Sequence, residues 1–152
     1  MKTSLLRATL VAGLLAGATS TAWAQNVADA ITARQTALKG IGAATGDIKK
    51  VMDAGGDLTT VAARGQEIAD NARKLPPLFP PGSGQESGIK TRALPALWQN
   101  KSDFEANAGK LAAEADKLTA VLKANDKAGV AAQFAATTAV CGNCHRPYRA
   151  PQ

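Results

Sequence analysis

The chain has 152 residues, with 18 basic and 12 acidic side chains and one histidine, giving a net charge of +6. This length corresponds to a single domain once a targeting segment is set aside. The positive excess is scattered along the chain rather than gathered in one run, which argues against a nucleic-acid-binding protein.

The first 24 residues have the pattern of a secretory signal peptide. A short basic region from Met1 to Arg7 precedes an apolar core over 10–16, and Ala22-Trp23-Ala24 supplies a small-x-small cleavage pattern. We expect cleavage to leave residues 25–152, one domain with a net charge of +4, because the removed segment carries two basic residues and no acid. The apolar core is too short for a stable membrane anchor, although retention as an uncleaved anchor is the alternative. The expected location is the periplasm of a Gram-negative bacterium, with no membrane attachment after cleavage.

Two stretches with helical apolar spacing follow. The first covers 27–52 in steps of three and four residues and ends before Gly55-Gly56. The second covers 58–75, where Asp57 is a suitable N-cap and Pro76-Pro77 stops the helix. Both stretches are long enough to span one side of a bundle.

Residues 76–95 form one long irregular connection that is rich in Pro, Gly and Ser. Its polarity suits a surface path, with Leu78 and Phe79 as an inward anchor. A third helix is predicted after Pro95 and Trp98, with a capping box at Ser102 and Glu105 and apolar spacing over 104–122.

Asn125-Asp126 should end that helix and cap a fourth, which continues the three-four spacing from 130 to 148. No alternating strand pattern stands out anywhere. Four helices joined by two short connections and one long one predict an all-α, up-down-up-down antiparallel four-helix bundle.

The fourth helix contains Cys141-Gly142-Asn143-Cys144-His145, which holds both cysteines and the only histidine of the chain. Cys-x-x-Cys-His is typical of covalent haem attachment, in which two thiols add to the haem vinyl groups and the imidazole becomes an axial iron ligand. On a helix these three side chains fall within about one turn on one face. Only five aromatic residues follow the signal segment, and a buried haem would supply the missing apolar bulk. One covalent haem c is therefore the expected cofactor.

Three other interpretations of the motif are open. A redox dithiol would need a βαβ context, which the chain lacks. A structural zinc site would need carboxylates, because there is no third cysteine and no second histidine. A disulfide between two positions three apart on a helix would be strained.

The second axial position of the iron has no evident ligand. In an antiparallel bundle the last helix lies against the first, which brings Arg34 and Leu38 to the level of the haem. Met52, the only thioether after the signal segment, lies about 21 Å further along at 1.5 Å per residue and should pack in the core. A lysine would have to enter an apolar interior. We therefore expect a five-coordinate, high-spin iron with Leu38 over its open face.

At these residues the chain resembles the cytochromes c′, the class II c-type cytochromes. The resemblance spans residues 25–152 and rests on Arg34-Gln35-x-x-Leu38, Leu75-Pro76 with Phe79 and Pro81-Gly82, Pro95-x-x-Trp98, and Cys141-x-x-Cys144-His145-x-x-Tyr148-Arg149. It implies a four-helix bundle in which Cys141 and Cys144 form thioethers and His145 binds the iron. Leu38 occupies the position at which low-spin relatives have a ligating methionine.

The resemblance also assigns two arginines to the haem pocket, and the long loop adds Phe79 as a candidate. Arg34 would lie near a propionate, although a snorkelling surface residue is the alternative. Arg149 would lie beside the imidazole, or else be a frayed terminal charge. Phe79 would contact the haem or simply fill the core. Pro147 departs from a regular helix and weakens the placement of the residues that follow it.

Two functions remain open. An apolar, vacant face lacks a donor for bound dioxygen and favours NO or CO, and the resemblance implies NO binding. A six-coordinate carrier that exchanges single electrons with periplasmic redox partners is the other, and a non-haem thiol protein is a remote third. No acid–base pair supports an enzyme. The resemblance also implies a homodimer through the first two helices.

Overall fold

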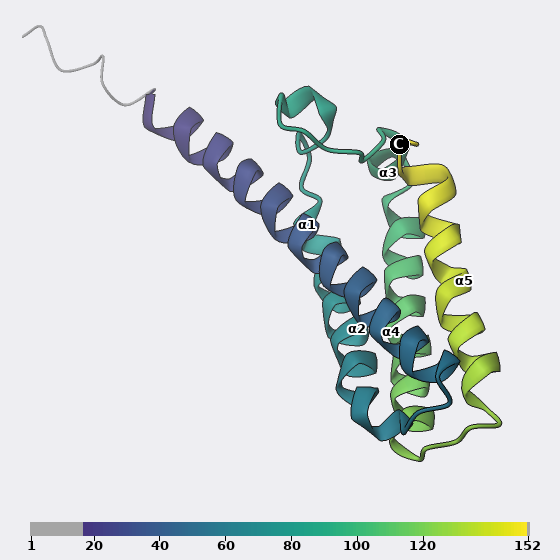
Figure 1. Cartoon of the computed structure of the whole chain (residues 1–152). Coiled ribbons are helices and arrows are strands. Elements are labelled where there is room, and N and C mark those ends of the chain that lie inside the picture. The colour runs from purple at the N-terminus through teal and green to yellow at the C-terminus, as the bar shows by residue number, and fades with distance from the viewer. Residues whose placement is uncertain (1–16, 152) are drawn as a thin grey trace, which may run out of the picture.

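The structure, a computed structural model, describes residues 17–151 (Figure 1). The expected signal segment lies partly outside the described residues. Residues 17–24 form the first turns of the long first helix, so the helix passes through the expected cleavage point. Cleavage after Ala24 stays a prediction, and it would leave a helix that begins at Gln25.

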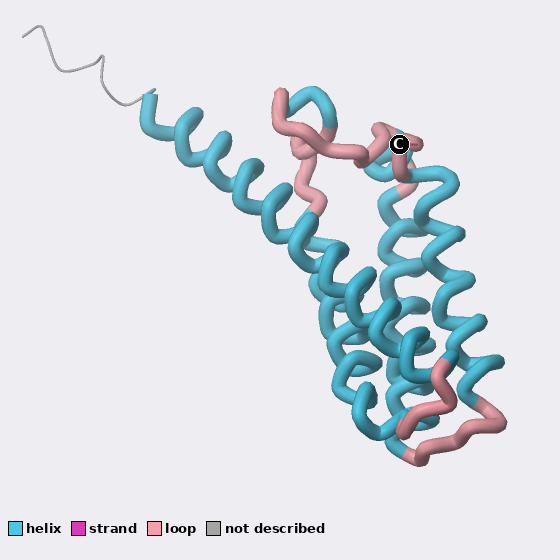
Figure 2. Tube along the Cα trace, viewed as in Figure 1, coloured by secondary structure: helices cyan, strands magenta, loops and turns pink. Residues whose placement is uncertain are grey.

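The described part of the chain is helical, with no extended strand in it (Figure 2). The four long helices are α1 (Gly17–Asp53), α2 (Ala62–Lys74), α4 (Lys101–Lys123) and α5 (Val130–Tyr148). Shorter helical segments are η1 (Leu58–Val61), η2 (Pro76–Leu78), η3 (Gln85–Ser87) and α3 (Ala96–Gln99). The long helices alternate in direction, which confirms the predicted antiparallel four-helix bundle (Figure 1).

Helix starts follow the sequence signals only in part. The Asp57 carboxylate accepts from the backbone N–H of Thr59, so the predicted N-cap is confirmed, although it caps η1. Asp126 accepts from the N–H groups of Ala128 and Gly129, one turn before α5 begins. Asn125, in the left-handed region at a φ of 50°, ties this turn to the 55–58 turn by accepting from the Leu58 N–H.

The capping box predicted at Ser102 and Glu105 is wrong. α4 begins at Lys101, with Asn100 at the N-cap, and no side chain caps the first turn. Asn100 directs its side-chain amide back to the carbonyl of Ala96 instead. Ser102 therefore lies one residue inside the helix, because the short helix α3 runs almost directly into α4 and sets its starting point.

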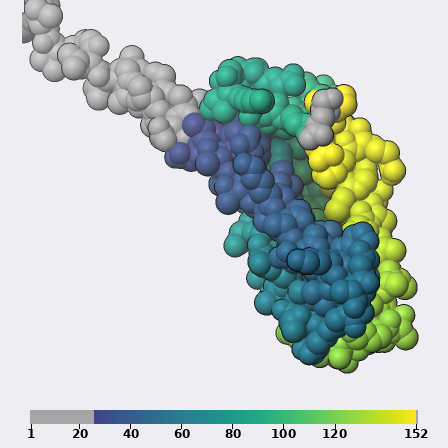
Figure 3. All heavy atoms as spheres, in the orientation of Figure 1, coloured from purple at the N-terminus to yellow at the C-terminus, as the bar shows by residue number. Residues whose placement is uncertain are grey.

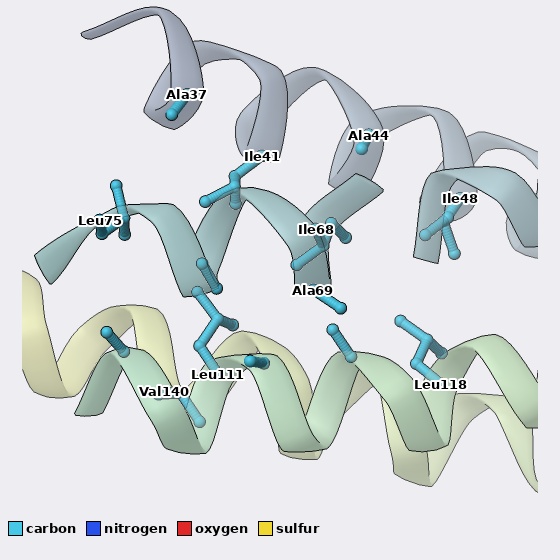
Figure 4. Packing of buried hydrophobic residues seen from close by; sticks show 14 of the residues in the cluster. Ala37, Ile41, Ala44, Ile48, Ile68, Ala69, Leu75, Leu111, Leu118 and Val140 are labelled. Atoms are coloured by element: carbon cyan, nitrogen blue, oxygen red, sulfur yellow. The ribbon is translucent and has the colours of Figure 1, made fainter. Parts of the chain in front are cut away.

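The core lies along α2 and α4, which pack on each other over most of their length. α1 packs against α2 and α5 against α4, with Ile41, Ile48, Ile68, Leu111 and Leu118 among the side chains between them (Figure 4). Gly65 on α2 faces Thr119 on α4, where a Cβ would lie 2.5 Å from the threonine Oγ1. This close contact sets the spacing of the central pair.

α1 and α5 reach the same end of the molecule, as expected, but make little direct contact with each other (Figure 1). The space-filling view shows the surface hollowed between the first part of α1 and the last part of α5 (Figure 3). Among the described residues, no helix has the length and apolarity needed to cross a membrane.

Candidate haem-attachment site

Cys141, Cys144 and His145 lie in the last two turns of α5, which stays helical through Pro147 to Tyr148. Proline lacks the N–H that would bond to the carbonyl four residues earlier, yet two residues further on the N–H of Arg149 donates to the His145 carbonyl at 3.2 Å. The helix thus ends just after the motif, and the three side chains share one face of a continuous helical segment.

Tyr148 fixes this end of α5 against the rest of the bundle. Its ring is buried and packs edge-on against Phe104 at a centroid distance of 6.1 Å. Its hydroxyl donates to the Asp103 carboxylate of α4 at 2.5 Å. Phe79, from the long loop, packs against the other side of Phe104 at 4.8 Å. An aromatic row therefore joins the loop, α4 and the end of α5.

The long loop also pairs with the C-terminal segment. The backbone N–H of Leu94 donates to the carbonyl of Tyr148 at 2.9 Å, and that of Ala150 donates to Arg92 at 2.8 Å. These bonds form an isolated antiparallel bridge between Ala93 and Arg149. The loop is thereby brought alongside the attachment motif.

Both cysteines are free thiols and are half-buried. Burial raises the pKa of Cys144 to about 11, with smaller contributions from Cys141 and the Asp103 charge. Burial also raises the pKa of Cys141. The pKa of His145 is lowered, first by burial and then by the positive charges of Arg149 and Arg92. A lowered pKa favours the neutral imidazole, which is the form that binds a metal.

The donor set suits haem attachment better than the alternatives. The described residues contain no cluster of three His, Cys, Asp or Glu side chains that could hold a metal ion, so a zinc site has no support. Two neighbouring thiols and one neutral imidazole on a single helical face match what covalent attachment and one axial ligand require.

Arg34 is buried, with only 2% of its surface exposed, so the snorkelling interpretation is wrong. Its terminal nitrogens donate to the Ser83 carbonyl and hydroxyl at 2.6 and 2.7 Å and to the Thr91 hydroxyl at 2.8 Å. Its guanidinium carbon also lies 4.5 Å from the centre of the Phe79 ring. Burial lowers the pKa of Arg34 to about 10. Arg34 clamps the loop to α1, and a propionate contact stays a prediction.

Phe79 is 5% exposed and belongs to the main core, which supports core packing as its role. Trp98 holds the loop there by donating its indole N–H to the carbonyls of Phe79 and Pro80. These contacts explain how an irregular segment of this length keeps a defined path. A haem contact by Phe79 stays a prediction.

Leu38 is 41% exposed, an unusual degree of exposure for a large apolar side chain of the described region. It lies one turn after Arg34 on α1, which borders the hollow in Figure 3. Met52 packs against the core near the opposite end of α1, as expected. The long helix therefore separates Met52 from the attachment motif.

Sequence reasoning missed three residues that shape this end of the molecule. Asp103 gave no signal except an acid in the first turn of a helix, and Ser83 was one polar residue in a polar loop. Arg92 became relevant only through the pairing of the loop with the C-terminus. Each owes its role to contacts between segments distant in the sequence.

The fold is an antiparallel four-helix bundle, and its last helix carries two free thiols and one histidine near its end. This combination is typical of a c-type haem protein built on a four-helix bundle. A model of the family described as Cytochrome C′ matches residues 29–149. The chain belongs to the cytochrome c′ family, whose members carry covalently attached haem c.

Similar proteins agree with this assignment. The chain is 35% identical over 147 residues to a cytochrome c′ of Rhodopseudomonas palustris, covering 95% of this chain and 97% of that one. It is 36% identical over 143 residues to a cytochrome c-556 of Agrobacterium fabrum, covering 93% and 94%. A solved cytochrome c′ described as having an unusual ligand-controlled dimer dissociation is 28% identical, with a TM-score of 0.73 and coverage of 81% and 95%.

Proposed function

We propose that this protein is an exported c-type cytochrome that carries one haem on α5. Cys141 and Cys144 would form the thioethers, and His145 would be the axial iron ligand. The observation that carries this assignment is the placement of two half-buried thiols and one part-exposed imidazole close together at the end of one helix. The attached haem supplies an iron centre that can bind a diatomic gas and exchange one electron.

Among the described residues, no second histidine and no methionine lies close to this site. The only histidine is His145, and Met52 lies near the far end of α1. Leu38 presents an apolar, partly exposed side chain at the position where the family resemblance expects the sixth ligand of low-spin members. We therefore propose a five-coordinate, high-spin iron that binds NO or CO. Leu38 has no hydrogen-bond donor with which to stabilise bound dioxygen.

Electron transfer is the second function that the site supports. His145 and both cysteines keep part of their surface exposed, so a group attached to them is accessible to a partner protein. Gas binding and one-electron exchange are compatible in one molecule. We propose no catalytic turnover, because no acid–base pair accompanies the motif.

Optical spectra of the exported protein, with and without CO, test the iron assignment. The expected result is a high-spin ferrous spectrum that changes on addition of CO. A six-coordinate, low-spin spectrum at neutral pH would refute the open coordination position. Mass spectrometry of Cys141→Ala and Cys144→Ala tests the attachment, because each variant should keep at most one thioether while the wild-type chain carries two.

Export and assembly have separate tests. N-terminal sequencing of the protein isolated from the periplasm should give Gln25, and a start elsewhere would contradict the cleavage site. We also propose a homodimer formed through α1 and α2, supported by the family resemblance. Sedimentation with and without CO should show a species of twice the chain mass whose population depends on the ligand, whereas a monomer under every condition would exclude the dimer.

A further inference from the structure

Four basic residues lie on two backbone segments that come together at the end of the molecule where α5 terminates. Lys90 and Arg92 come from the long loop, and Arg146 and Arg149 come from the C-terminal segment. We call these four residues the basic face. Along the sequence, Lys90 and Arg92 are more than 50 residues from Arg146 and Arg149, so the four residues do not form one basic run. The bridge between Ala93 and Arg149 brings the pairs together.

Backbone and side-chain bonds hold the basic face in place. Arg92 donates from Nε and Nη2 to the Ala150 carbonyl, at 2.9 and 2.6 Å. Arg146 donates to the Asn143 side-chain oxygen at 3.0 Å, within the attachment motif. Gln35 of α1 donates to the carbonyl of Lys90 at 3.0 Å. All of these acceptors are neutral, so the bonds orient the cations without cancelling their charge.

The ion pairs found in the described part of the chain lie elsewhere. They involve five other cations: Lys49, Arg64, Arg73, Lys101 and Lys117. No carboxylate is within ion-pairing distance of the basic face in the region that the structure describes. The backbone N–H of Arg149 donates to the His145 carbonyl at 3.2 Å, and Arg92 binds the carbonyl of the next residue, Ala150, so both cations lie next to the attachment motif. Positive charge without an ion-pair partner therefore lies on the loop and C-terminal sides of the haem-attachment site, while the Asp103 carboxylate lies on its α4 side.

We propose that the basic face is the surface on which an acidic redox protein docks to exchange an electron with the haem. This inference rests on the proposed haem assignment and adds the chemistry of the partner. Like-signed charge around a site speeds the encounter of an oppositely charged partner by roughly 10- to 1000-fold and orients it on arrival. Ile89, exposed beside Lys90, adds a small apolar contact of the kind that protein interfaces contain.

An acidic protein fits this surface better than a membrane does. A lipid surface offers the haem no electron, whereas a redox partner must approach the attachment end of α5. Stable membrane binding through a surface patch needs a broad apolar face as well as basic residues. Ile89 is a single exposed apolar side chain, and Leu38, the other exposed large apolar residue among those whose burial is described, lies on α1.

The test compares two double variants of the haem-loaded protein with identical net charge. Lys90→Glu/Arg146→Glu reverses charge on the basic face. Lys50→Glu/Lys123→Glu makes the same change in the last turns of α1 and α4, at the opposite end of the bundle (Figure 1). None of the four residues is assigned a role in holding the haem.

The probes are hexacyanoferrate(III), an anion, and hexaammineruthenium(III), a cation. Each takes one electron from the ferrous protein and leaves it ferric, and the second-order rate is measured against ionic strength. Lys90→Glu/Arg146→Glu should lower the rate of electron transfer to hexacyanoferrate(III) about tenfold at low salt and raise the rate to hexaammineruthenium(III). Lys50→Glu/Lys123→Glu should change both rates by less than about twofold. Equal effects of the two variants, or rates that move in the same direction for both probes, would overturn the proposal.

A second measurement needs no electron transfer and separates protein from lipid as the partner. Fluorescent poly-L-glutamate serves as the acidic polypeptide, and vesicles of phosphatidylglycerol as the anionic membrane. Weaker binding of the polypeptide by Lys90→Glu/Arg146→Glu alone supports the proposal, and vesicle binding stronger than polypeptide binding overturns it. If the spectrum shows that the protein carries no haem, the haem assignment fails, and this measurement still decides whether the basic face binds an acidic polypeptide.

Discussion

The hydroxyl of Tyr148 donates a hydrogen bond to the Asp103 carboxylate at 2.5 Å, joining the last residue of α5 to the first turn of α4. Asp103 is exposed and keeps access to water, whereas the tyrosine ring is buried. The contact holds the end of α5 that carries the motif, even though Pro147 has removed one helical hydrogen bond there.

The first prediction concerns the ionisation of Tyr148. The hydrogen bond to Asp103, followed by burial, raises the pKa of Tyr148 to about 12. Because this is the only tyrosine in the chain, NMR of a protein labelled in tyrosine should show one titrating resonance with a midpoint near this value. A midpoint near 10, the ordinary value, would show that the contact does not persist in solution.

The raised pKa has a consequence for stability at high pH. Between about 10 and 12 the native state binds more protons at this site than the unfolded chain, so stability falls as the pH rises through that range. Arg34, whose pKa is lowered to about 10, acts in the opposite direction in the same range. The difference in unfolding free energy between wild type and Tyr148→Phe isolates the tyrosine, and it should shrink as the pH is raised.

The second prediction concerns Arg34. Arg34→Met removes the donors to Ser83, whose hydroxyl and carbonyl lie in a fully buried residue. We expect a loss of about 2 kcal/mol in unfolding free energy and faster hydrogen exchange in residues 78–91, because buried acceptors are left unpaired. Gln35→Met is the control, since its side chain is exposed and makes one loop contact. Equal losses for both variants would contradict the clamp.

The third prediction uses two glycines in helices. A Cβ at Gly65 would meet Thr119 Oγ1 at 2.5 Å and its Cα at 3.1 Å, and a backbone atom cannot rotate away. Gly65→Ala should therefore cost about 2 kcal/mol by forcing α2 from α4. Gly109→Ala on α4 meets nothing within 4 Å and should stabilise by about 0.5–1 kcal/mol. Chemical denaturation measures both, and a neutral Gly65→Ala would show that the helix pair can separate freely.

The fourth prediction concerns Leu38 and tests the open coordination position. Leu38→Met places a thioether, which can ligate haem iron, at an exposed position of α1 that bears an apolar side chain in this chain. We expect the haem-loaded variant to show a low-spin spectrum and weakened CO binding. Leu38→Ile keeps the volume and lacks sulfur, so it should remain high-spin. A high-spin Leu38→Met variant would mean that Leu38 is not directed at the iron.

Sequence periodicity was sufficient to locate the four long helices and their antiparallel order, because apolar side chains must recur every three or four residues to form a buried stripe. The attachment motif could also be identified from the sequence, because both cysteines and the only histidine lie within five consecutive residues. The start of α4 was missed because the packing of α3, and not a cap, places it.

Contacts between distant segments were decided only by the tertiary structure. Whether Arg34 faced water or the loop depended on Ser83, 49 residues away, and the sequence has no pattern that pairs them. The gathering of Lys90 and Arg92 with Arg146 and Arg149 likewise depends on a backbone bridge that no periodicity encodes. Local spacing reports which face of a helix is buried, whereas the partner of a buried or charged group is determined by how the whole chain folds back on itself.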